Sequence, residues 1–365
     1  MTDKESAIVA LLRQNPYLTQ QEMAETLGMS RPALANLISG LTRRGVIKGR
    51  AYVLAEENRV AVIGGANVDR KFHLKAPIQA GTSNPSNVTV SVGGVARNVA
   101  ENLGRLGHPV SLLTVAGPDA DWQRIEEASA GHIDLTHAAQ LPGRTTGSYS
   151  AVLSPDGEMA VALADMEVYD HLTPEYIDAH RSALAGAALI AIDLNCPADT
   201  VRHVQRIALE ERTPLAVVPV SSPKMDRMPD DLSGVAWFIC NRDEAETYTG
   251  ISIRDDVSWR EAVQVLLSKG AESVAVTSGS GGVMAGKRDA EISRFPAVPN
   301  VRVEDVTGAG DAFVSGVLHG HLAGRLFGES VRLGLANAAM TLGSPHTVRP
   351  ELTEAQLESE MEELQ

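Results

Sequence analysis

The feature of this 365-residue sequence that most constrains its fold is an alternation, from Arg59 onward, of short apolar runs with amphipathic segments of helix length. The apolar runs are rich in Val, Ile, Leu and Ala, as buried β-strands are. Strands that alternate with helices in this way are typical of a layered α/β fold with a mainly parallel sheet. We predict strands at 60–63, 112–116, 188–192, 215–218, 237–239 and 274–277.

Two segments, residues 70–92 and 147–163, depart from this alternation. Each of them alternates polar with apolar residues, which is the pattern of a strand with one exposed face. The second segment also contains a Ser-Pro-Asp-Gly turn at 154–157. We predict that the two segments form an antiparallel flap that stands off the main sheet.

The composition is that of a globular protein able to bury a large core, with 44% hydrophobic and 21% charged residues. No apolar run approaches the roughly 18 residues of a membrane span, and the N-terminus lacks the basic start and apolar core of a signal peptide. The two cysteines, Cys196 and Cys240, do not have metal-ligand spacing. We therefore expect a cytoplasmic protein with reduced thiols and no membrane partner.

The first 55 residues differ from the rest in charge and pattern. Residues 1–54 contain seven Lys or Arg and four Asp or Glu, a net charge of about +3, whereas the whole chain carries −14. We predict three short helices here, the second starting with a Thr19–Glu22 capping box and the third following Ser30. Residues 46–54 alternate like a two-stranded wing. A polar linker then leads to a second domain, at 59–365.

This first segment resembles a winged helix-turn-helix domain, whose third helix would read DNA. The resemblance implies DNA as a partner through residues 1–55. The alternative is a small helical bundle that serves packing or dimerisation and whose charges are merely solvated. The acidic remainder of the chain argues against nonspecific nucleic-acid binding by the main domain. The candidate DNA contacts are Arg31, Asn36, Arg43 and Arg44 on the third helix and Lys48 and Arg50 on the wing.

The strongest chemical signal is the string Asp-Val-Thr-Gly-Ala-Gly-Asp-Ala-Phe at 305–313, just ahead of an apolar, helix-like run. Gly308, Ala309 and Gly310 would place open backbone N–H groups at a helix N-terminus, where the dipole and the unpaired donors favour an anion. Asp311 would then lie beside that anion and take a proton from a hydroxyl that attacks a phosphoryl group. The alternative is an ordinary glycine-rich turn capped by Asp311.

A second string, Gly-Gly-Val-Ala-Arg-Asn-Val-Ala at 93–100, opens another predicted helix. Gly93 and Gly94 let the backbone approach a ligand closely, and Asn98 can both donate to and accept from a hydroxyl. Taken alone, such a glycine pair is more often a packing feature. Together, the two strings resemble the signatures of the ribokinase (PfkB) family of carbohydrate and nucleoside kinases, and the resemblance extends over residues 59 to about 350.

The resemblance implies a three-layer α/β/α sandwich with a small β lid over the substrate. It also implies ATP and Mg²⁺ as cofactors, with Glu244 acting on Mg²⁺ through water. Asn67 and Asp69 would hold the sugar hydroxyls, for which the alternative is an Asx turn after a strand. Asp305 and Thr307 would help to bind a monovalent cation such as K⁺.

Nucleotide contacts are also implied by the resemblance. For the loop at 277–282 the alternative is a flexible turn, and for the helical Asn337 it is a buried amide that caps a neighbour. The implied nucleotide-binding residues are Asn241, Thr277, Gly279, Gly282, Gly308, Gly310 and Asn337.

Within the family, several strings resemble the bacterial pseudouridine kinases: Thr-Ser-Asn-Pro at 82–85, Thr-Gly-Ser-Tyr at 146–149, Gly-Glu-Met at 157–159 and Ala-Asp-Met at 164–166. This resemblance implies that the lid residues Ser83, Asn84, Ser148 and Tyr149 meet a uracil-type base. Val218 departs from the pattern, because an acidic residue is expected there.

Two alternatives remain beside phosphorylation of the 5′-hydroxyl of pseudouridine. One is a kinase of another nucleoside or of a free sugar. The other is a DNA-binding transcriptional regulator that uses the kinase body as a ligand sensor. Lid strands expose sheet edges, and lids commonly pair in this family, so a homodimer is also expected.

Overall fold

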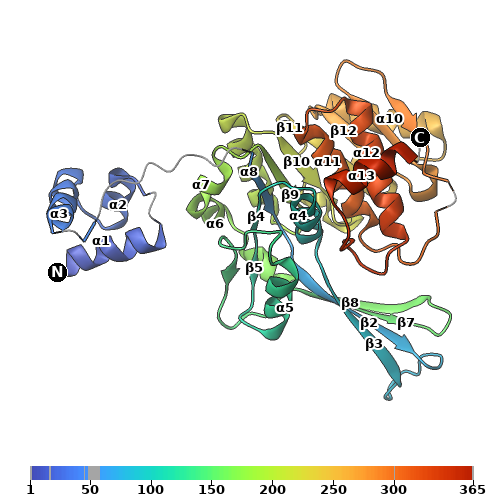
Figure 1. Cartoon of the computed structure of the whole chain (residues 1–365), viewed down its shortest axis with the longest axis horizontal. Helices are drawn as coiled ribbons and strands as arrows, with labels where there is room; N and C mark the ends of the chain where they lie inside the picture. Colours follow the sequence, from blue (N-terminus) through green and yellow to red (C-terminus); the bar gives the residue numbers. More distant parts are fainter. Residues whose placement is uncertain (1, 16–17, 45, 48–57, 300, 364–365) are drawn as a thin grey trace. The chain divides into compact units, whose positions relative to one another are not determined.

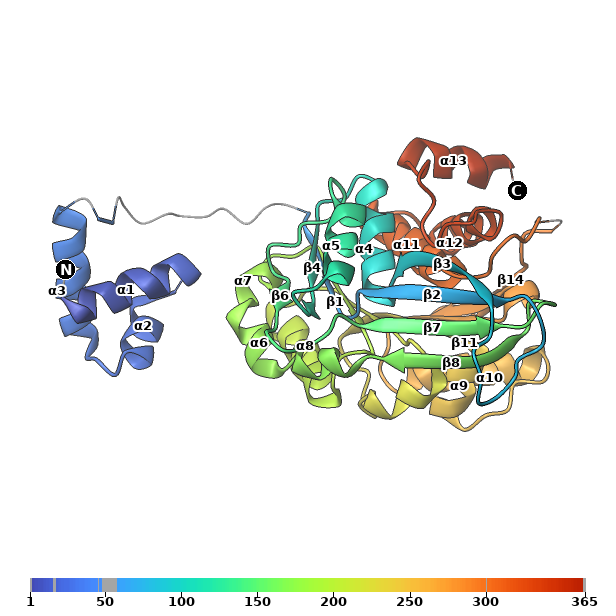
Figure 2. The ribbon, with the colours of Figure 1, turned by 90° about the horizontal axis from the view of Figure 1, so that it is seen from below.

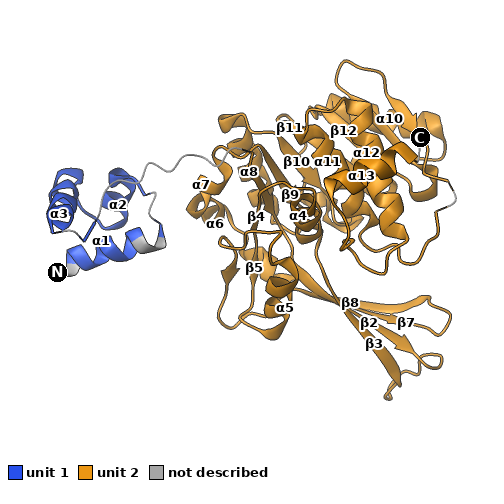
Figure 3. Cartoon of the chain, in the orientation of Figure 1, with its two compact units in different colours: residues 1–55 blue, residues 56–365 orange. Residues whose placement is uncertain are grey.

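The computed structural model describes residues 2–15, 18–44, 46–47, 58–299 and 301–363. The chain forms two compact units, residues 1–55 and 56–365 (Figure 3). Each unit has an apolar core of its own. None of the helices in these described ranges is long and apolar enough to cross a membrane.

The described part of the small unit contains three helices packed around a core that includes Ile8, Leu34 and Leu41. The capping box predicted for the second helix is confirmed: Thr19 N–H donates to Glu22 Oε2 (2.7 Å), and Glu22 N–H donates to Thr19 Oγ1 (3.2 Å). The predicted wing lies mostly outside the described residues, and with it Lys48 and Arg50. The helices are α1 (Asp3–Gln14), α2 (Gln20–Thr26) and α3 (Arg31–Arg43).

The large unit is built on an eight-stranded sheet with the order β14-β13-β12-β11-β10-β9-β1-β4. The six strands from β12 to β4 are mutually parallel, and β13 and β14 add an antiparallel edge. The predicted, mainly parallel sheet is therefore confirmed. The strands are β1 (Val60–Ile63), β4 (Val110–Leu113), β9 (Leu189–Asp193), β10 (Leu215–Val218), β11 (Val235–Asn241), β12 (Ser273–Thr277), β13 (Val283–Lys287) and β14 (Ser293–Phe295).

The strand predicted at 112–116 is wrong in one respect, because it is two strands rather than one. The chain leaves the main sheet at Thr114, and β5 (Val115–Ala116) pairs instead with β6 (Ala139–Gln140). The run is apolar on both sides of Thr114, so its hydrophobicity alone does not reveal the break.

Helices cover both faces of the main sheet, as alternate residues along each strand require. In β1, Val60 and Val62 enter one core and Ala61 and Ile63 the other. Figure 2 shows α4, α5, α11 and α12 on one side and α8, α9 and α10 on the other. These helices are α4 (Val95–Arg105), α5 (Ala120–Ser129), α6 (Pro174–Ala179), α7 (Arg181–Leu184), α8 (Ala198–Glu211), α9 (Arg242–Thr249), α10 (Asp256–Ser268), α11 (Ala309–Leu322), α12 (Phe327–Leu342) and α13 (Glu354–Glu363), with short 3-10 turns at Glu167–His171, Ser222–Arg227 and Gly279–Gly281.

A second sheet of four strands projects from this body and forms the lid (Figure 1). The prediction of an antiparallel flap is right for its two hairpins, β2–β3 and β7–β8. It is wrong for the pair that joins them, because β2 and β7 run parallel. The order is β3-β2-β7-β8, and the strands are β2 (Asn67–Leu74), β3 (Ser86–Gly93), β7 (Ser148–Leu153) and β8 (Met159–Asp165).

Candidate active site

The glycine-rich string at 305–313 forms the start of helix α11, as predicted. Gly308 is the residue before the first helical turn and has φ of +84°, a left-handed backbone that favours glycine. A Cβ at this position would lie 2.2 Å from the carbonyl oxygen of Thr347, so a side chain would also be excluded by space. Ala309 and Gly310 follow in the first turn, where backbone N–H groups have no carbonyl partner within the helix; the Ala309 N–H makes only a long hydrogen bond, at 3.4 Å, to the carbonyl oxygen of Val306 before it. The turn is therefore built to present N–H groups to an anion.

Asp311 in the first turn of α11 meets the second glycine signature. Asn98 Nδ2, on α4, donates to Asp311 Oδ2 at 2.8 Å across 213 residues of sequence. Burial raises the pKa of Asp311 to about 7, against the opposing hydrogen bond from Asn98, and the charges of Asp193, Asp69 and Glu244 add to the rise. A carboxylate with this pKa is suited to accept a proton near neutral pH.

Asp69 and Asn67 lie at the base of the lid strand β2. Asn67 Nδ2 donates to Asp69 Oδ1 at 2.5 Å, which fixes the amide and the carboxylate side by side. Burial raises the pKa of Asp69 to about 6, with Lys71 and Asn67 acting in the opposite direction. A Cβ on Gly93 would lie 2.3 Å from Asp69 Oδ2, so this glycine makes room for the carboxylate. An amide and a carboxylate fixed in this way can accept from and donate to a pair of hydroxyls.

A buried aspartate at the end of β9, which was not among the predicted site residues, joins these segments. Asp193 Oδ2 accepts from the backbone N–H groups of Gly65 and Ala96, both at 3.0 Å. Gly65 leads into β2 and Ala96 lies in the first turn of α4, so one carboxylate holds both substrate-side segments in place. Burial raises the pKa of Asp193, and the hydrogen bonds from Gly65 and Asn195 oppose the rise. Its signal in the sequence is an acidic residue closing a wholly apolar strand.

The loop after β12 and the start of α9 enclose an open hollow of about 640 Å³. Asn241 precedes the first turn of α9, and Glu244 completes a capping box with it: Asn241 N–H donates to Glu244 Oε2 (2.8 Å), and Glu244 N–H donates to Asn241 Oδ1 (2.9 Å). Gly282 closes the turn by accepting from Ser278 N–H at 2.9 Å. The hollow is lined by Asn241, Arg242, Asp243, Thr277, Ser278, Gly279, Ser280 and Gly281.

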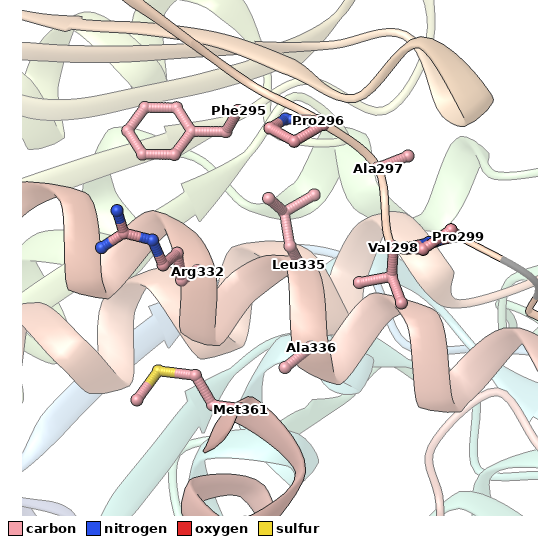
Figure 4. A pocket seen from close by; sticks show the side chains of 9 residues that line it. All are labelled: Phe295, Pro296, Ala297, Val298, Pro299, Arg332, Leu335, Ala336 and Met361. Atoms are coloured by element: carbon pink, nitrogen blue, oxygen red, sulfur yellow. The ribbon is translucent and has the colours of Figure 1, made fainter. Parts of the chain in front are cut away.

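A second, largely apolar cavity of about 220 Å³ lies between α12, α13 and the segment after β14. Figure 4 shows the segment 295–299 passing over α12, with Leu335 and Val298 facing the same space. The neighbouring Asn337 is fully buried and is not among the lining residues. Its Nδ2 donates to Asn102 Oδ1 (3.1 Å) and to the carbonyl oxygen of Ala312 (2.9 Å). The structure thus favours the alternative of an amide that joins helices, and a nucleotide contact from Asn337 stays a prediction.

A sequence model of pfkB family carbohydrate kinases matches residues 57–354, and a winged helix-turn-helix DNA-binding model matches residues 1–48. The pseudouridine kinase of Escherichia coli is 31% identical over 312 residues, which cover 85% of this chain and 98% of the relative. This chain belongs to the pfkB family. It is therefore a carbohydrate or nucleoside kinase, a phosphotransferase with an alcohol group as acceptor.

Two further comparisons extend this result. YeiI of Escherichia coli, described as an uncharacterized sugar kinase, is 30% identical over 354 residues and 97% of each chain. A solved carbohydrate kinase from Agrobacterium tumefaciens superimposes with a TM-score of 0.72 at 30% identity, over 84% of this chain and 97% of that one. The ribokinase-like fold predicted from the sequence is therefore confirmed.

The lid of this pfkB-family chain places only one of the four predicted base-contacting residues beside Asp69. Tyr149 on β7 pairs in register with Asp69 and shares its face of the sheet. Ser148 is the preceding residue and pairs with Val68, so it belongs to the face of the lid opposite Asp69.

Ser83 and Asn84 lie in the loop that joins β2 to β3, at the end of the hairpin remote from Asp69. The amide of Asn84 serves this loop: Gln79 N–H donates to Asn84 Oδ1 at 2.8 Å, and Asn84 Nδ2 donates back to the Gln79 carbonyl oxygen at 2.9 Å. Five strand residues separate this loop from Asp69, a span of about 17 Å. The described structure therefore does not place Ser83 or Asn84 beside Asp69, where the substrate-side residues lie.

Glu244 fits a magnesium site that works through water. Its carboxylate is buried, and burial raises its pKa despite the hydrogen bond from Asn241. A desolvated carboxylate gains from a nearby divalent cation. Across the described ranges no three acidic, His or Cys side chains gather as a closed metal site. Magnesium beside Glu244 would therefore take most of its ligands from water and phosphate oxygens.

Asp305 and Thr307 do not fit an open cation site in the same way. Lys71 Nζ, from the lid strand β2, donates to Asp305 Oδ2 at 2.5 Å and to Thr307 Oγ1 at 3.1 Å. The other carboxylate oxygen, Oδ1, accepts from Thr307 N–H (2.9 Å) and from its hydroxyl (2.6 Å). Both oxygens of Asp305 are therefore occupied by groups of the chain itself. Lys71 was not among the predicted site residues, although a strand with a period of two puts it on the face of Asp69.

Proposed function

We propose that this protein is an ATP-dependent kinase that phosphorylates the 5′-hydroxyl of a nucleoside, with pseudouridine as the preferred substrate. The observation that carries the proposal is the meeting of Asp311 and Asn98 at the N-terminus of α11, with a pKa near 7 for the carboxyl group. Similarity to the pseudouridine kinase of Escherichia coli over nearly the whole of that relative supports the choice of nucleoside.

In the proposed reaction, the substrate hydroxyl lies between Asp311 and the γ-phosphoryl group of ATP. The hydroxyl oxygen attacks phosphorus, the bond to the bridging oxygen of ADP breaks, and the hydroxyl proton passes to the Asp311 carboxylate. The N–H groups of Gly308, Ala309 and Gly310 would stabilise the charge that develops on the transferring group. Mg²⁺ held through Glu244 would neutralise charge on the β- and γ-phosphates.

The substrate and nucleotide would bind on opposite sides of Asp311. Asn67 and Asp69 suit the two vicinal hydroxyls of a ribosyl group, and Tyr149 on the same face of the lid would meet the base. The phosphates would lie in the hollow lined by Thr277 and Gly279. The apolar cavity beside Leu335 would hold a nucleotide base.

An ATP-consumption assay with Mg²⁺ tests the proposal across pseudouridine, uridine, inosine, adenosine, cytidine, ribose and fructose. We expect kcat/KM for pseudouridine to exceed the others by about tenfold or more, equivalent to about 1.4 kcal/mol of transition-state discrimination. A higher value for another nucleoside would retain the kinase mechanism and refute the substrate. No turnover with any of them would refute the proposed activity and favour the ligand-sensing regulator.

We also propose that the protein is a cytoplasmic homodimer joined through its lids. The face of the lid opposite Asp69 carries exposed apolar side chains on both edge strands of the sheet, β3 and β8. Leu163 is 65% exposed and Val90 46%, which is costly for side chains of this size unless a partner covers them. The other members of this apolar lid face are Val88 and Val161.

A second candidate function, DNA binding by the small unit, is favoured by the winged helix-turn-helix match over residues 1–48. Arg31, Asn36 and Arg43 are exposed on α3, as a recognition helix requires. Arg44 is less available for a DNA contact, because it forms an ion pair with Glu5 at 2.6 Å.

Fluorescence anisotropy with DNA selected from a random-sequence library tests this second function. The variant Arg31→Glu/Arg43→Glu should lose sequence-specific binding while its kinase turnover stays unchanged. Equal affinity of the variant and the wild-type protein for the selected DNA would refute it.

A further inference from the structure

The half-buried ammonium group of Lys71 donates hydrogen bonds to the side chains of Asp305 and Thr307. Among the described residues, no other lysine or arginine side chain forms a hydrogen bond with this turn. The side chains of Lys71 and Asp305 are 28% and 30% exposed, so the pair is partly withdrawn from water. Lys71 is the second residue after Asp69 on β2. The Asp305–Thr307 turn directly precedes Gly308, the first residue of the anion cradle, by which we mean the backbone N–H groups of Gly308–Gly310. One side chain thus connects the strand that carries the substrate-side carboxylate with the loop that would hold the phosphoryl group.

The turn that Lys71 contacts is fixed on its other side by the main body. Glu304 N–H donates to the carbonyl oxygen of Leu342, at the end of α12, at 2.7 Å. Thr307 Oγ1 and N–H both reach Asp305 Oδ1, so the carboxylate also shapes the backbone just before Gly308. The charge state of Asp305 therefore bears on the direction of the N–H groups that follow it.

We propose that the Lys71 ammonium group acts as the built-in monovalent cation of this turn, so that phosphoryl transfer by this chain does not require K⁺. The inference rests on the proposed kinase function. An ammonium group carries the same charge as a potassium ion and presents three N–H donors, two of which already meet oxygens of the turn. It is also supplied covalently, so no binding entropy has to be lost when it takes this place.

Because Lys71 lies on the lid strand β2, its contact with the turn depends on the position of the lid. The positive charge reaches the turn only when β2 lies against it, and the same strand brings Asp69 to the substrate. The position of the lid and the geometry of the phosphate cradle are thereby coupled through one side chain. An ordinary surface ion pair, by contrast, contributes only about 0–1 kcal/mol and would leave the reaction indifferent to its loss.

The test compares wild-type protein with Lys71→Met, which keeps the length of the side chain and removes its charge. Turnover is measured in choline, sodium and potassium chloride at a constant ionic strength of about 0.15 M. We expect wild-type turnover to differ by less than about twofold between choline and potassium. Lys71→Met should fall about tenfold or more in choline and recover selectively in potassium. Lys75→Met removes an exposed lysine from the same hairpin and should behave like the wild type.

Thermal unfolding in the same salts gives a readout that does not depend on turnover. Potassium should raise the Tm of Lys71→Met above its value in choline and leave the Tm of the wild-type protein unchanged. If no nucleoside is phosphorylated, the proposed function fails, but this salt-specific shift still tests the cation site. Potassium stimulation of the wild-type protein, or full activity of Lys71→Met in choline with no salt-specific shift, would overturn the inference.

Discussion

At the scale of single residues, Asp311 combines two opposing effects of burial. Removal from water makes its carboxylate a stronger base, which a proton acceptor near neutral pH needs. The same desolvation makes the ionised form costly to the folded protein. The negative charges of Asp193, Asp69 and Glu244 act in the same direction. Asn98 offsets part of this cost, because its amide donates to the carboxylate.

The first prediction is a pH profile for kcat/KM of the nucleoside. Only the deprotonated form of Asp311 can accept the hydroxyl proton, so kcat/KM should fall about tenfold per pH unit below the pKa of about 7. Asp69, with a pKa of about 6, should steepen the fall further at lower pH. Steady-state kinetics in buffers of constant ionic strength measure this limb. A profile that stays flat through the range would contradict the role of Asp311.

The second prediction concerns Asp311→Asn, which keeps the shape and can still accept from Asn98. Loss of the proton acceptor should lower kcat by roughly 10²–10⁴-fold. The variant should also be more stable than the wild type at alkaline pH, where the buried charge is present. The sign follows from linkage: the pKa of Asp311 is raised from 3.8 to about 7 on folding, so the unfolded state loses its proton first. Stability of the wild type is therefore lost as the pH rises between these values.

Differential scanning calorimetry checks this second prediction. Above pH 7 the variant should melt several degrees higher than the wild-type protein, whereas near pH 4 the two should coincide. An equal difference in Tm at both pH values would show that the effect does not come from the charge of Asp311.

At the scale of elements, the start of α11 depends on a backbone that only glycine adopts without cost. The third prediction is that Gly308→Ala lowers kcat by about 10²-fold or more, because the cradle must shift. The added Cβ would clash with the Thr347 carbonyl oxygen, and alanine would also have to adopt the left-handed φ of +84°.

Gly324→Ala is the matched control, since Gly324 has φ of +68° but open space where the added Cβ would lie. The control should lose about 1–2 kcal/mol of stability and keep its kcat. Similar kinetics for both variants would argue against a cradle at Gly308.

The starts of several helices were predictable because they depend on residues that are close together in the sequence. The Asn241–Glu244 capping box needs only a spacing of three residues, and the start of α11 only a short string. The pairing within the lid was less predictable. Tyr149 and Ser148 are adjacent in sequence, yet only the register with β2 decides which of them shares the face of Asp69.

At the scale of the whole molecule, the apolar lid face should bury itself against a second copy. The fourth prediction is that the wild-type protein has twice the chain mass of 38.7 kDa in light scattering, whereas Leu163→Glu has the mass of one chain. Leu163 lies on the edge strand β8, and a buried, unpaired charge there would cost more than the apolar contact contributes. Val257→Glu, at a 75% exposed position on α10, is the control and should remain dimeric. A monomeric wild-type protein would refute the lid interface.

Contacts between distant segments set the limit of prediction from sequence. Asp193 reaches Gly65 across 128 residues, and Lys71 reaches Asp305 across 234 residues. No local pattern specifies such a pair, because it depends on the strand order of the sheet and on the lid position. The partners of the buried Asn337 amide were not predictable for the same reason, since they lie on other helices.

The alternation of strands and helices, the two glycine turns and the family of the chain could all be read from short stretches of sequence. These features follow from local backbone preferences and from hydrophobic periodicity, which are properties of neighbouring residues. Which polar side chains meet depends on the packed structure: Asp311 accepts a hydrogen bond from the Asn98 amide, and Asp305 forms an ion pair with Lys71. Ion pairs and desolvation depend on distance and burial, and both quantities exist only once the sheet, the helices and the lid have packed together.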